Sequence, residues 1–199
     1  MIWAVVLAAG KSLRMGSPKM LLHFGRKTLI EKVVGGVTKF PVDGIIVVLG
    51  ARRGELELLL RPYPVKPLFN PDFEQGMLSS IQRGLEDLPA EARAVLVVLG
   101  DQPWTPASVV ERLISGFEQS GKGIVLPVHG RRRGHPVLIN LKYRREIMDL
   151  DPAVGLRQLL LRHPDDILEV RVRTPSVLRD IDSPEDFRKA LKPYRRRSG

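Results

Sequence analysis

The residues best suited to chemistry stand in one short stretch near the start of the chain, LAAGKSLRMGSPK at 7–19. The stretch follows Ile2–Leu7, an apolar run that is typical of a buried strand. Gly10 lets the backbone approach a ligand closely, and exposed N–H groups in such a turn bind oxyanions. Arg14 adds a planar guanidinium that can bond to a phosphate through two hydrogen bonds, and Lys19 adds a compact ammonium group. The pattern predicts a loop that binds the phosphates of a nucleoside triphosphate.

This loop follows neither of the two common glycine-rich patterns. A Walker loop needs a glycine, four residues and then Gly-Lys-Ser/Thr, whereas here Gly10 is followed by Gly16 and Ser17. A dinucleotide-binding loop needs a glycine where Ser12 stands. The plainer alternative is a strand-to-helix turn whose charged side chains are merely solvated.

Carboxylates at two later places are candidates for holding a metal ion. Asp101 follows the apolar run Val95–Leu99, and Mg²⁺ prefers one or two carboxylates together with phosphate oxygens. Asp180 and Asp182 flank Ile181, so they share one face of an extended segment. The alternatives are that Asp101 serves only a turn, and that the other two serve only the helix start that follows them.

The loop as a whole resembles the signature of the MobA-like nucleotidyltransferases, Leu-Ala-Ala/Gly-Gly-x-x-x-Arg-Met-Gly followed by Lys. Three later groups of residues resemble one branch of that family, the molybdenum cofactor cytidylyltransferases. They are Asn70-Pro71 with GMLSSI at 76–81 and Gly84-Leu85, GDQP at 100–103, and GHPV at 134–137. The resemblance extends from Ile2 to about Leu191.

The resemblance implies transfer of CMP from CTP to the phosphate of the molybdenum cofactor, with release of pyrophosphate and with Mg²⁺ as cofactor. The implied nucleotide-binding residues are Leu7, Ala8, Ala9, Gly10, Ser12, Arg14, Lys19, Gly76, Ser80 and Gly100. Arg14, Lys19 and Asp101 are the implied catalytic residues, and Asp101 and Asp180 the implied metal ligands. The implied acceptor-binding residues are Gln102, Arg133, His135, Pro136 and Arg157, although Leu156 stands where the family usually has alanine.

A reaction of this type needs few groups from the protein. The attacking phosphate is already an anion, so catalysis consists of alignment and of neutralising charge, without a strong general base. Arg14, Lys19 and the metal ion supply that charge. For the base, Ala9 stands where guanylyltransferases have glycine, which favours a pyrimidine and hence CTP over GTP. The resemblance also assigns Ser80 to the cytosine, while Ser79 or Ser80 could instead cap the helix that follows.

Apolar strand-like runs alternate with amphipathic stretches along the first two thirds of the chain. The expected strands are Ile2–Leu7, Ile45–Leu49, Val95–Leu99, Ile124–Val128, His135–Asn140 and Ile167–Val172. The expected helices are Thr28–Lys39, Arg53–Arg61, Met77–Leu88, Pro106–Gln119, Lys142–Asp149, Val154–Arg162 and one that begins at Ser183-Pro184. Thr105 is expected to cap the fourth of these helices. The alternation predicts a three-layer, Rossmann-like α/β fold with a mostly parallel sheet and helices on both faces. In such sheets ligands bind at the carboxyl ends of the strands.

At 199 residues, with 43% hydrophobic residues, the chain is long enough for one domain, expected at 1–191 with acceptor binding at about 129–180. Five basic residues and no acid fall in the last eleven positions, so half of the net charge of +10 lies in a tail. We expect its end, 192–199, to be disordered. The absence of cysteine excludes disulfides and thiolate sites and fits the cytoplasm. No run reaches the length of a membrane span, and the first apolar residues are expected to form a strand, not a signal peptide.

Four other functions remain open at this stage. The same fold and loop serve guanylyltransferases that use GTP, and cytidylyltransferases for isoprenoid or sugar phosphates. A nucleic-acid-binding protein would use the basic tail, but only 6% of the residues are aromatic and no binding motif for nucleic acid is present. A chaperone for a molybdenum enzyme could keep the fold and lose turnover, although Arg14, Lys19 and Asp101 are all intact. Expected partners are therefore the small-molecule substrates, with a molybdenum enzyme or its chaperone as a further partner.

Overall fold

In the computed structural model, ten strands and seven α-helices are described, over residues 1–12 and 15–195. The strands are β1 (Ile2–Ala8), β2 (His23–Phe24), β3 (Lys27–Thr28), β4 (Gly44–Leu49), β5 (Lys66–Phe69), β6 (Ala94–Leu99), β7 (Ile124–His129), β8 (Arg132–Arg133), β9 (Val137–Asn140) and β10 (Ile167–Arg171). The helices are α1 (Leu29–Val37), α2 (Arg53–Leu60), α3 (Met77–Glu86), α4 (Ala107–Ser120), α5 (Arg144–Met148), α6 (Arg157–Arg162) and α7 (Pro184–Arg195).

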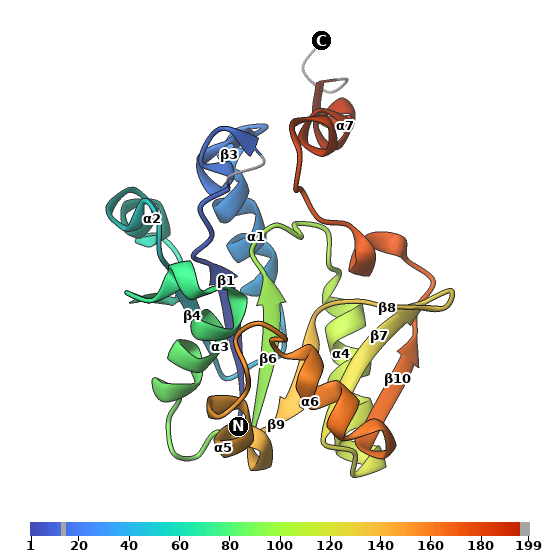
Figure 1. The fold of residues 1–199 in the computed structure, drawn as a ribbon. Helices are drawn as coiled ribbons and strands as arrows, with labels where there is room; N and C mark the ends of the chain where they lie inside the picture. The colour runs from blue at the N-terminus through green and yellow to red at the C-terminus, as the bar shows by residue number, and fades with distance from the viewer. Residues whose placement is uncertain (13–14, 196–199) are drawn as a thin grey trace.

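One sheet forms the centre of the molecule, in the order β10-β7-β9-β6-β1-β4-β5, with β8 paired to β7 (Figure 1). Strand β1 pairs in parallel with both β4 and β6, and β9 is antiparallel to β6 and β7. Because β1 is central and almost entirely apolar, it is buried on both faces. The predicted mostly parallel α/β sheet is confirmed.

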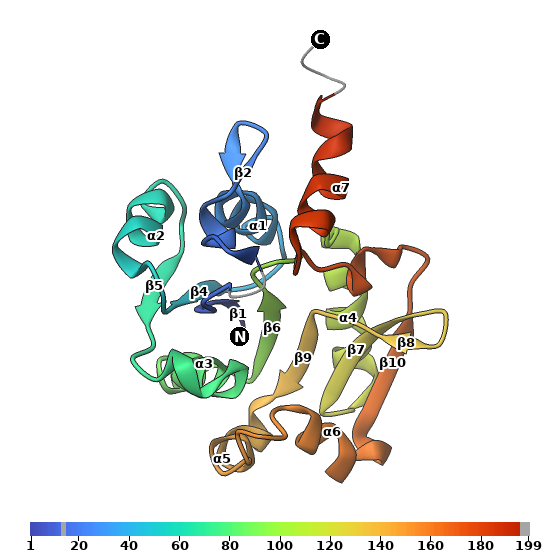
Figure 2. The ribbon, with the colours of Figure 1, turned by 45° about the horizontal axis from the view of Figure 1, so that its top comes forward.

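Helices cover both faces of this sheet and form two separate cores. One core joins alternate residues of β1, β4 and β6 to α1, α2, α4 and α7. The other joins the intervening residues of the same strands to α3, α5 and α6. Successive side chains of a strand point to opposite faces, so a continuous apolar run fills both cores at once. Figure 2 shows the two helical layers on either side of the sheet, with α7 standing beyond the end of β6.

Several helix ends differ from the sequence prediction. Helix α4 begins at Ala107, and Pro106 occupies the N-cap position with no capping side chain, so the predicted cap by Thr105 is wrong. Pro106 takes an extended φ/ψ, so the helix begins one residue later than the pattern indicated. Ser79 and Ser80 lie inside α3, whose N-cap is Gly76. Helix α1 has the full capping box that its sequence allows, between Thr28 and Glu31.

The final helix is longer than predicted. Ser183 and Asp186 bond reciprocally at its start, as the sequence indicated. The helix then continues to Arg195, so four residues of the segment 192–199 that we expected to be disordered are helical. Because adding residues to an existing helix requires no new nucleation, α7 can continue beyond its last apolar residues. Residues 196–199 lie outside the described residues.

Four of the described strands were not predicted. Among these described strands, β2 and β3 have two residues each and pair only with each other. Strand β5 contains Pro67, which suits only the edge of a sheet, and β8 is a two-residue strand that returns antiparallel to β7. No helix of the described residues is both long and apolar enough to cross a membrane.

Candidate active site

Two parallel strands deliver the expected binding residues to one edge of the sheet. Strand β1 ends at Ala8 and β6 ends at Leu99, and the Gly100 N–H donates to the Leu7 carbonyl oxygen at 3.0 Å. A Cβ atom on Gly100 would lie 2.5 Å from the same oxygen. Glycine therefore lets the two loops approach each other, and this brings Asp101 beside the phosphate loop.

Lys19 connects the phosphate loop with both acidic segments. Its Nζ donates to Asp101 Oδ2 at 2.7 Å, to Asp182 Oδ1 at 3.0 Å and to the Ile181 carbonyl oxygen at 3.0 Å. Its backbone N–H donates to Ser12 Oγ at 3.1 Å. Burial disfavours the Lys19 ammonium, but attraction and hydrogen bonds from Asp101 and Asp182 outweigh it and raise its pKa above the usual value. Lys19 is therefore fully charged at neutral pH.

The carboxylate of Asp101 retains room for a cation. Its Oδ2 accepts from Lys19, while Oδ1 is buried and has no hydrogen-bond partner within the described residues. An unpaired buried carboxylate oxygen is costly, and a metal ion would satisfy it. Among those same residues, no group of three or more acidic or histidine side chains is arranged to hold a metal ion alone. The arrangement fits a divalent ion that takes some of its ligands from Asp101 and the rest from the phosphate oxygens of a nucleotide.

Asp180 and Asp182 take different positions in the site. Asp182 shares Lys19 with Asp101, whereas Asp180 belongs to the exposed residues. Although the residue as a whole is exposed, partial desolvation of its carboxyl, together with repulsion from Asp182 and Asp101, raises the pKa of Asp180. The three carboxylates therefore share one electrostatic environment around a single lysine.

Two adjoining cavities lie on the α3 side of the phosphate loop. The first, of about 200 Å³, includes Ala9, Gly76, Ser80, Gly100 and Asp101 in its lining. The second, of about 500 Å³, includes Lys11, Ser12, Glu74 and Asp182. Gly10, Lys19 and Phe73 line both cavities. A ligand can therefore extend from Ser80 past Lys19 to the outer part of the loop.

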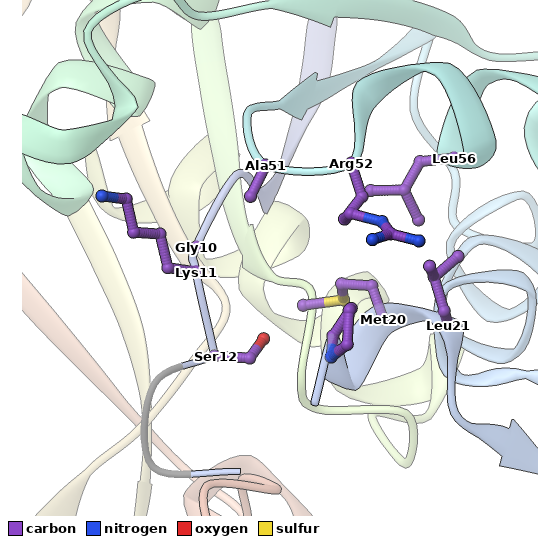
Figure 3. A pocket seen from close by; sticks show the side chains of 9 residues that line it. Gly10, Lys11, Ser12, Met20, Leu21, Ala51, Arg52 and Leu56 are labelled. Atoms are coloured by element: carbon purple, nitrogen blue, oxygen red, sulfur yellow. The ribbon is translucent and has the colours of Figure 1, made fainter. Parts of the chain in front are cut away.

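A third cavity, of about 350 Å³, lies on the α2 side of the same loop. Figure 3 shows Arg52 and Leu56 facing Met20 and Leu21 across it, while the Lys11 side chain extends away. Arg52 begins α2 with a left-handed backbone at φ 61° and pairs with Glu55. Because most of the side chains that line this cavity are apolar and the Lys11 side chain extends away from it, the cavity offers little to a triphosphate.

A fourth cavity, of about 440 Å³, contains three of the expected acceptor-binding residues, Arg133, His135 and Arg157. Most of its lining is apolar, and Met77 lines both this cavity and the one that contains Ser80. Burial lowers the pKa of His135, and attraction from Asp101 opposes that shift only in part. The imidazole is therefore neutral at pH 7, and Asp101 is near enough to influence it.

Comparisons with known proteins agree with this geometry. Residues 4–167 match the family model of the MobA-like NTP transferase domain. The chain belongs to the MobA-like NTP transferase family. The molybdenum cofactor cytidylyltransferase of Escherichia coli (strain K12) is 28% identical over 191 residues, which cover 96% of this chain and 95% of that protein.

Solved structures of other proteins are also similar to this chain. The Mycobacterium sp. strain JC1 homologue of the M. tuberculosis protein Rv0371c has a TM-score of 0.88 and 28% identity, and the match covers 98% of this chain and 97% of that one. Rv0371c of M. tuberculosis H37Rv, solved as a complex with manganese, has a TM-score of 0.81 and 24% identity, with 96% and 98% covered. The protein is thus a nucleotidyltransferase with a Rossmann-like fold.

The nucleotidyltransferase fold brings most of the predicted residues together, and a few lie elsewhere. Arg14 lies outside the described residues. Ala8 is buried in β1, and Gln102 and Pro136 are buried beside the site without lining the four cavities. Asp180, a predicted metal ligand, is exposed and does not line them either. Gln102 Oε1 has no hydrogen-bond partner among the described residues.

Several residues of the site were not identified from the sequence, because their types and spacing do not distinguish them from ordinary core or loop residues. Phe73 lines the nucleotide cavities but is an ordinary apolar residue in the sequence, and Met77 was noted only as part of the motif at 76–81. Asn70 was noted only as part of a motif, yet it bonds to both serines of α3. The Asn70-Pro71 pair is the one signal that could have marked it.

Proposed function

We propose that this nucleotidyltransferase is a CTP:molybdenum cofactor cytidylyltransferase. The observation that carries the proposal is the continuity of one cavity from Ala9 and Ser80 to Lys19 and Asp101, with the apolar acceptor cavity beginning at Met77. The similarity to the E. coli cytidylyltransferase over nearly the whole of both chains supports the same assignment.

In this proposal the nucleotide occupies the two adjoining cavities on the α3 side of the loop. The base lies between Ala9 and Ser80, and the triphosphate follows Gly10 and Ser12 to Lys19. The methyl group of Ala9, which is only 5% exposed, narrows the floor of the base site and disfavours a purine. Lys19 and the loop N–H groups hold the phosphates and neutralise their charge.

The acceptor binds on the other side of Met77. The apolar lining suits a flat heterocycle, and Arg133 and Arg157 offer guanidinium groups to its terminal phosphate. Arg133 also pairs with Glu169 at 2.7 Å, which orients its guanidinium at the rim. His135 is neutral and can donate or accept one hydrogen bond without adding charge.

The reaction is an in-line displacement at the α-phosphorus of CTP. An oxygen of the acceptor phosphate forms the new bond to that phosphorus, and the bond to the bridging oxygen of the β-phosphate breaks, releasing pyrophosphate. Asp101, with Asp180 or Asp182, would hold a divalent ion such as Mg²⁺, which supplies charge neutralisation on the α- and β-phosphates. With the charge of these carboxylates balanced by such an ion, the Lys19 ammonium would be available to donate to the phosphates. No group has to remove a proton from the nucleophile.

The decisive experiment incubates the purified protein with each labelled nucleoside triphosphate, Mg²⁺ and molybdopterin or molybdenum cofactor, followed by analysis of products. We expect the cytosine dinucleotide and one pyrophosphate per turnover. Equal or better transfer from GTP would move the protein to the guanylyltransferases. Transfer of CMP to a sugar or isoprenoid phosphate in place of the pterin would overturn the assignment of the acceptor.

A further inference from the structure

The orientation of the Asn70 amide is fixed by a backbone group. Its Oδ1 accepts from the Asp72 N–H at 2.9 Å, and a backbone N–H can only donate. The other end of the amide must therefore be the NH₂ group. Its two hydrogens go to Ser79 Oγ and Ser80 Oγ, both at 3.0 Å. Asn70 is only 1% exposed, so water does not compete for these bonds.

The two serine hydroxyls that accept from Asn70 differ in what they donate to. The single hydrogen of the Ser79 hydroxyl is directed back into the protein, where the carbonyl oxygens of Asp72 at 2.8 Å and Gly76 at 2.9 Å accept it. The Ser80 hydroxyl has no acceptor among the described residues; its one bond there is the bond that it accepts from Asn70. Ser80 is 3% exposed and lines the cavity that also contains Ala9 and Asp101.

A hydroxyl that accepts one hydrogen bond from a fixed donor directs its own hydrogen elsewhere. The helix places the Ser80 side chain at the cavity, so a ligand in that cavity is the partner left for this hydrogen. We propose that Asn70 is a positioning residue that makes Ser80 an obligate hydrogen-bond donor to the nucleotide base. The proposal rests on the proposed function, which places the base beside Ser80.

This polarity selects between the two pyrimidines. The O2 atom is an acceptor in both pyrimidines, so the discrimination acts at N3. Cytosine N3 is an acceptor and satisfies a Ser80 hydrogen directed at it, whereas uracil carries a hydrogen on N3, which would face the Ser80 hydrogen. The methyl group of Ala9 disfavours purines, and the direction of the one hydrogen bond at N3 disfavours UTP. Asn70 thus becomes a specificity-determining residue that does not touch the base.

The test replaces Asn70 by aspartate, which keeps the shape and still accepts from the Asp72 N–H. The carboxylate accepts from the Ser80 hydroxyl, turning the Ser80 hydrogen away from the cavity. We expect the ratio of CTP to UTP affinity, measured by calorimetry with each nucleotide alone, to fall by about 10- to 100-fold in Asn70→Asp. Loss of CTP affinity should account for most of the change, with UTP affinity unchanged or improved.

Three further variants separate polarity from structural damage. Ser79→Ala removes the other hydroxyl bonded to Asn70 and should leave the CTP:UTP ratio unchanged. In a Ser80→Ala background, Asn70→Asp should change the ratio no further. Where Asn70→Asp does not fold, as checked by circular dichroism, Asn70→Ala frees the Ser80 hydroxyl to rotate and should still lower the ratio. An equal loss of CTP and UTP affinity in the folded Asn70 variants would overturn the proposal.

Failure of this inference is distinguishable from failure of the proposed function. Wild-type protein that binds CTP no better than UTP or GTP would remove the cytidylyltransferase assignment. Wild-type protein that prefers CTP, with a preference that survives every Asn70 substitution, would refute the role of Asn70 alone. Because no acceptor is present in the binding measurement, the identity of the acceptor does not enter the result.

Discussion

The replacement of Lys19 by methionine tests whether the lysine ammonium occupies the place of a metal ion. Methionine keeps most of the apolar stem and removes the charge that lies 2.7 Å from Asp101 and 3.0 Å from Asp182. The variant leaves these two carboxylates close together without the Lys19 charge. We therefore expect the variant to be less stable than wild type in the absence of metal, and to regain that stability when a divalent ion is added.

The magnitude follows from the burial of the three side chains. Their exposed fractions are 12% for Lys19, 18% for Asp101 and 30% for Asp182, between those of surface pairs and fully buried pairs. Surface pairs contribute roughly 0.2–1 kcal/mol, and removing one partner of a buried pair costs roughly 3–5 kcal/mol. We expect a loss of about 2 kcal/mol in the free energy of unfolding. The assay is urea denaturation with and without Mn²⁺.

The same assay reports the competition between lysine and metal. Without Lys19 the ion meets no competing cation, so Mn²⁺ should bind at least about tenfold more tightly, which adds about 1.4 kcal/mol of stabilisation at saturating metal. The control is Lys142→Met, whose Nζ lies 2.7 Å from Asp166, away from the nucleotide cavities. Equal stabilisation of wild type and Lys19→Met by Mn²⁺ would refute the reasoning, because Lys19 would then not occupy the place of the ion.

Four further outcomes are expected. Asp101→Ala should abolish nucleotide transfer and leave the circular dichroism spectrum unchanged; turnover within about threefold of wild type at low Mg²⁺ would contradict its role. Ala9→Gly should raise kcat/KM for GTP by about tenfold relative to CTP, since it removes the methyl group that a purine would meet. Burial raises the pKa of Asp166, but bonds from Lys142, Tyr143 and the Gly123 N–H outweigh it and lower that pKa to about 2. Asp166→Asn should therefore lower stability at pH 7 by about 1 kcal/mol after allowance for solvent screening, with a deficit that shrinks as the pH falls from 4 towards 2, and Asp165→Asn should not. Removing 194–199 should leave transfer unchanged, because the residues lining the four cavities end at Asp182.

The parts of the site that lie at strand ends were predictable from the sequence. A buried parallel strand is a continuous apolar run, and the sheet brings the carboxyl ends of such runs to one edge. Gly10 and Asp101 both follow runs of this kind, so local pattern alone places them together. The same reasoning gives no information on β8, because this strand has only two residues and no periodicity.

The hydrogen-bond pattern around α3 could not be predicted in the same way. Ser79 and Ser80 stand near a helix start, where capping is the usual role of serine. Gly76 takes the N-cap position instead, with φ 105°, and this moves both hydroxyls inside the helix and toward Asn70. The hydrogen bonds of these serines therefore depend on the conformation of Gly76 and on Asn70, which follows β5. No local sequence pattern relates these two residues to each other.

The meeting of Lys19 with Asp182 has its cause outside the site. The two residues are 163 positions apart, and each lies next to a segment that packs on Phe24. The Phe24 ring contacts Phe187 of α7 and Trp104 edge-on, with ring centroids 6.1 Å apart in both cases. Phe24 follows Lys19 by five residues, and Phe187 follows Asp182 by five. The aromatic contact therefore packs the last helix against β2, which follows the phosphate loop, and the capped start of that helix places Asp182 beside Lys19.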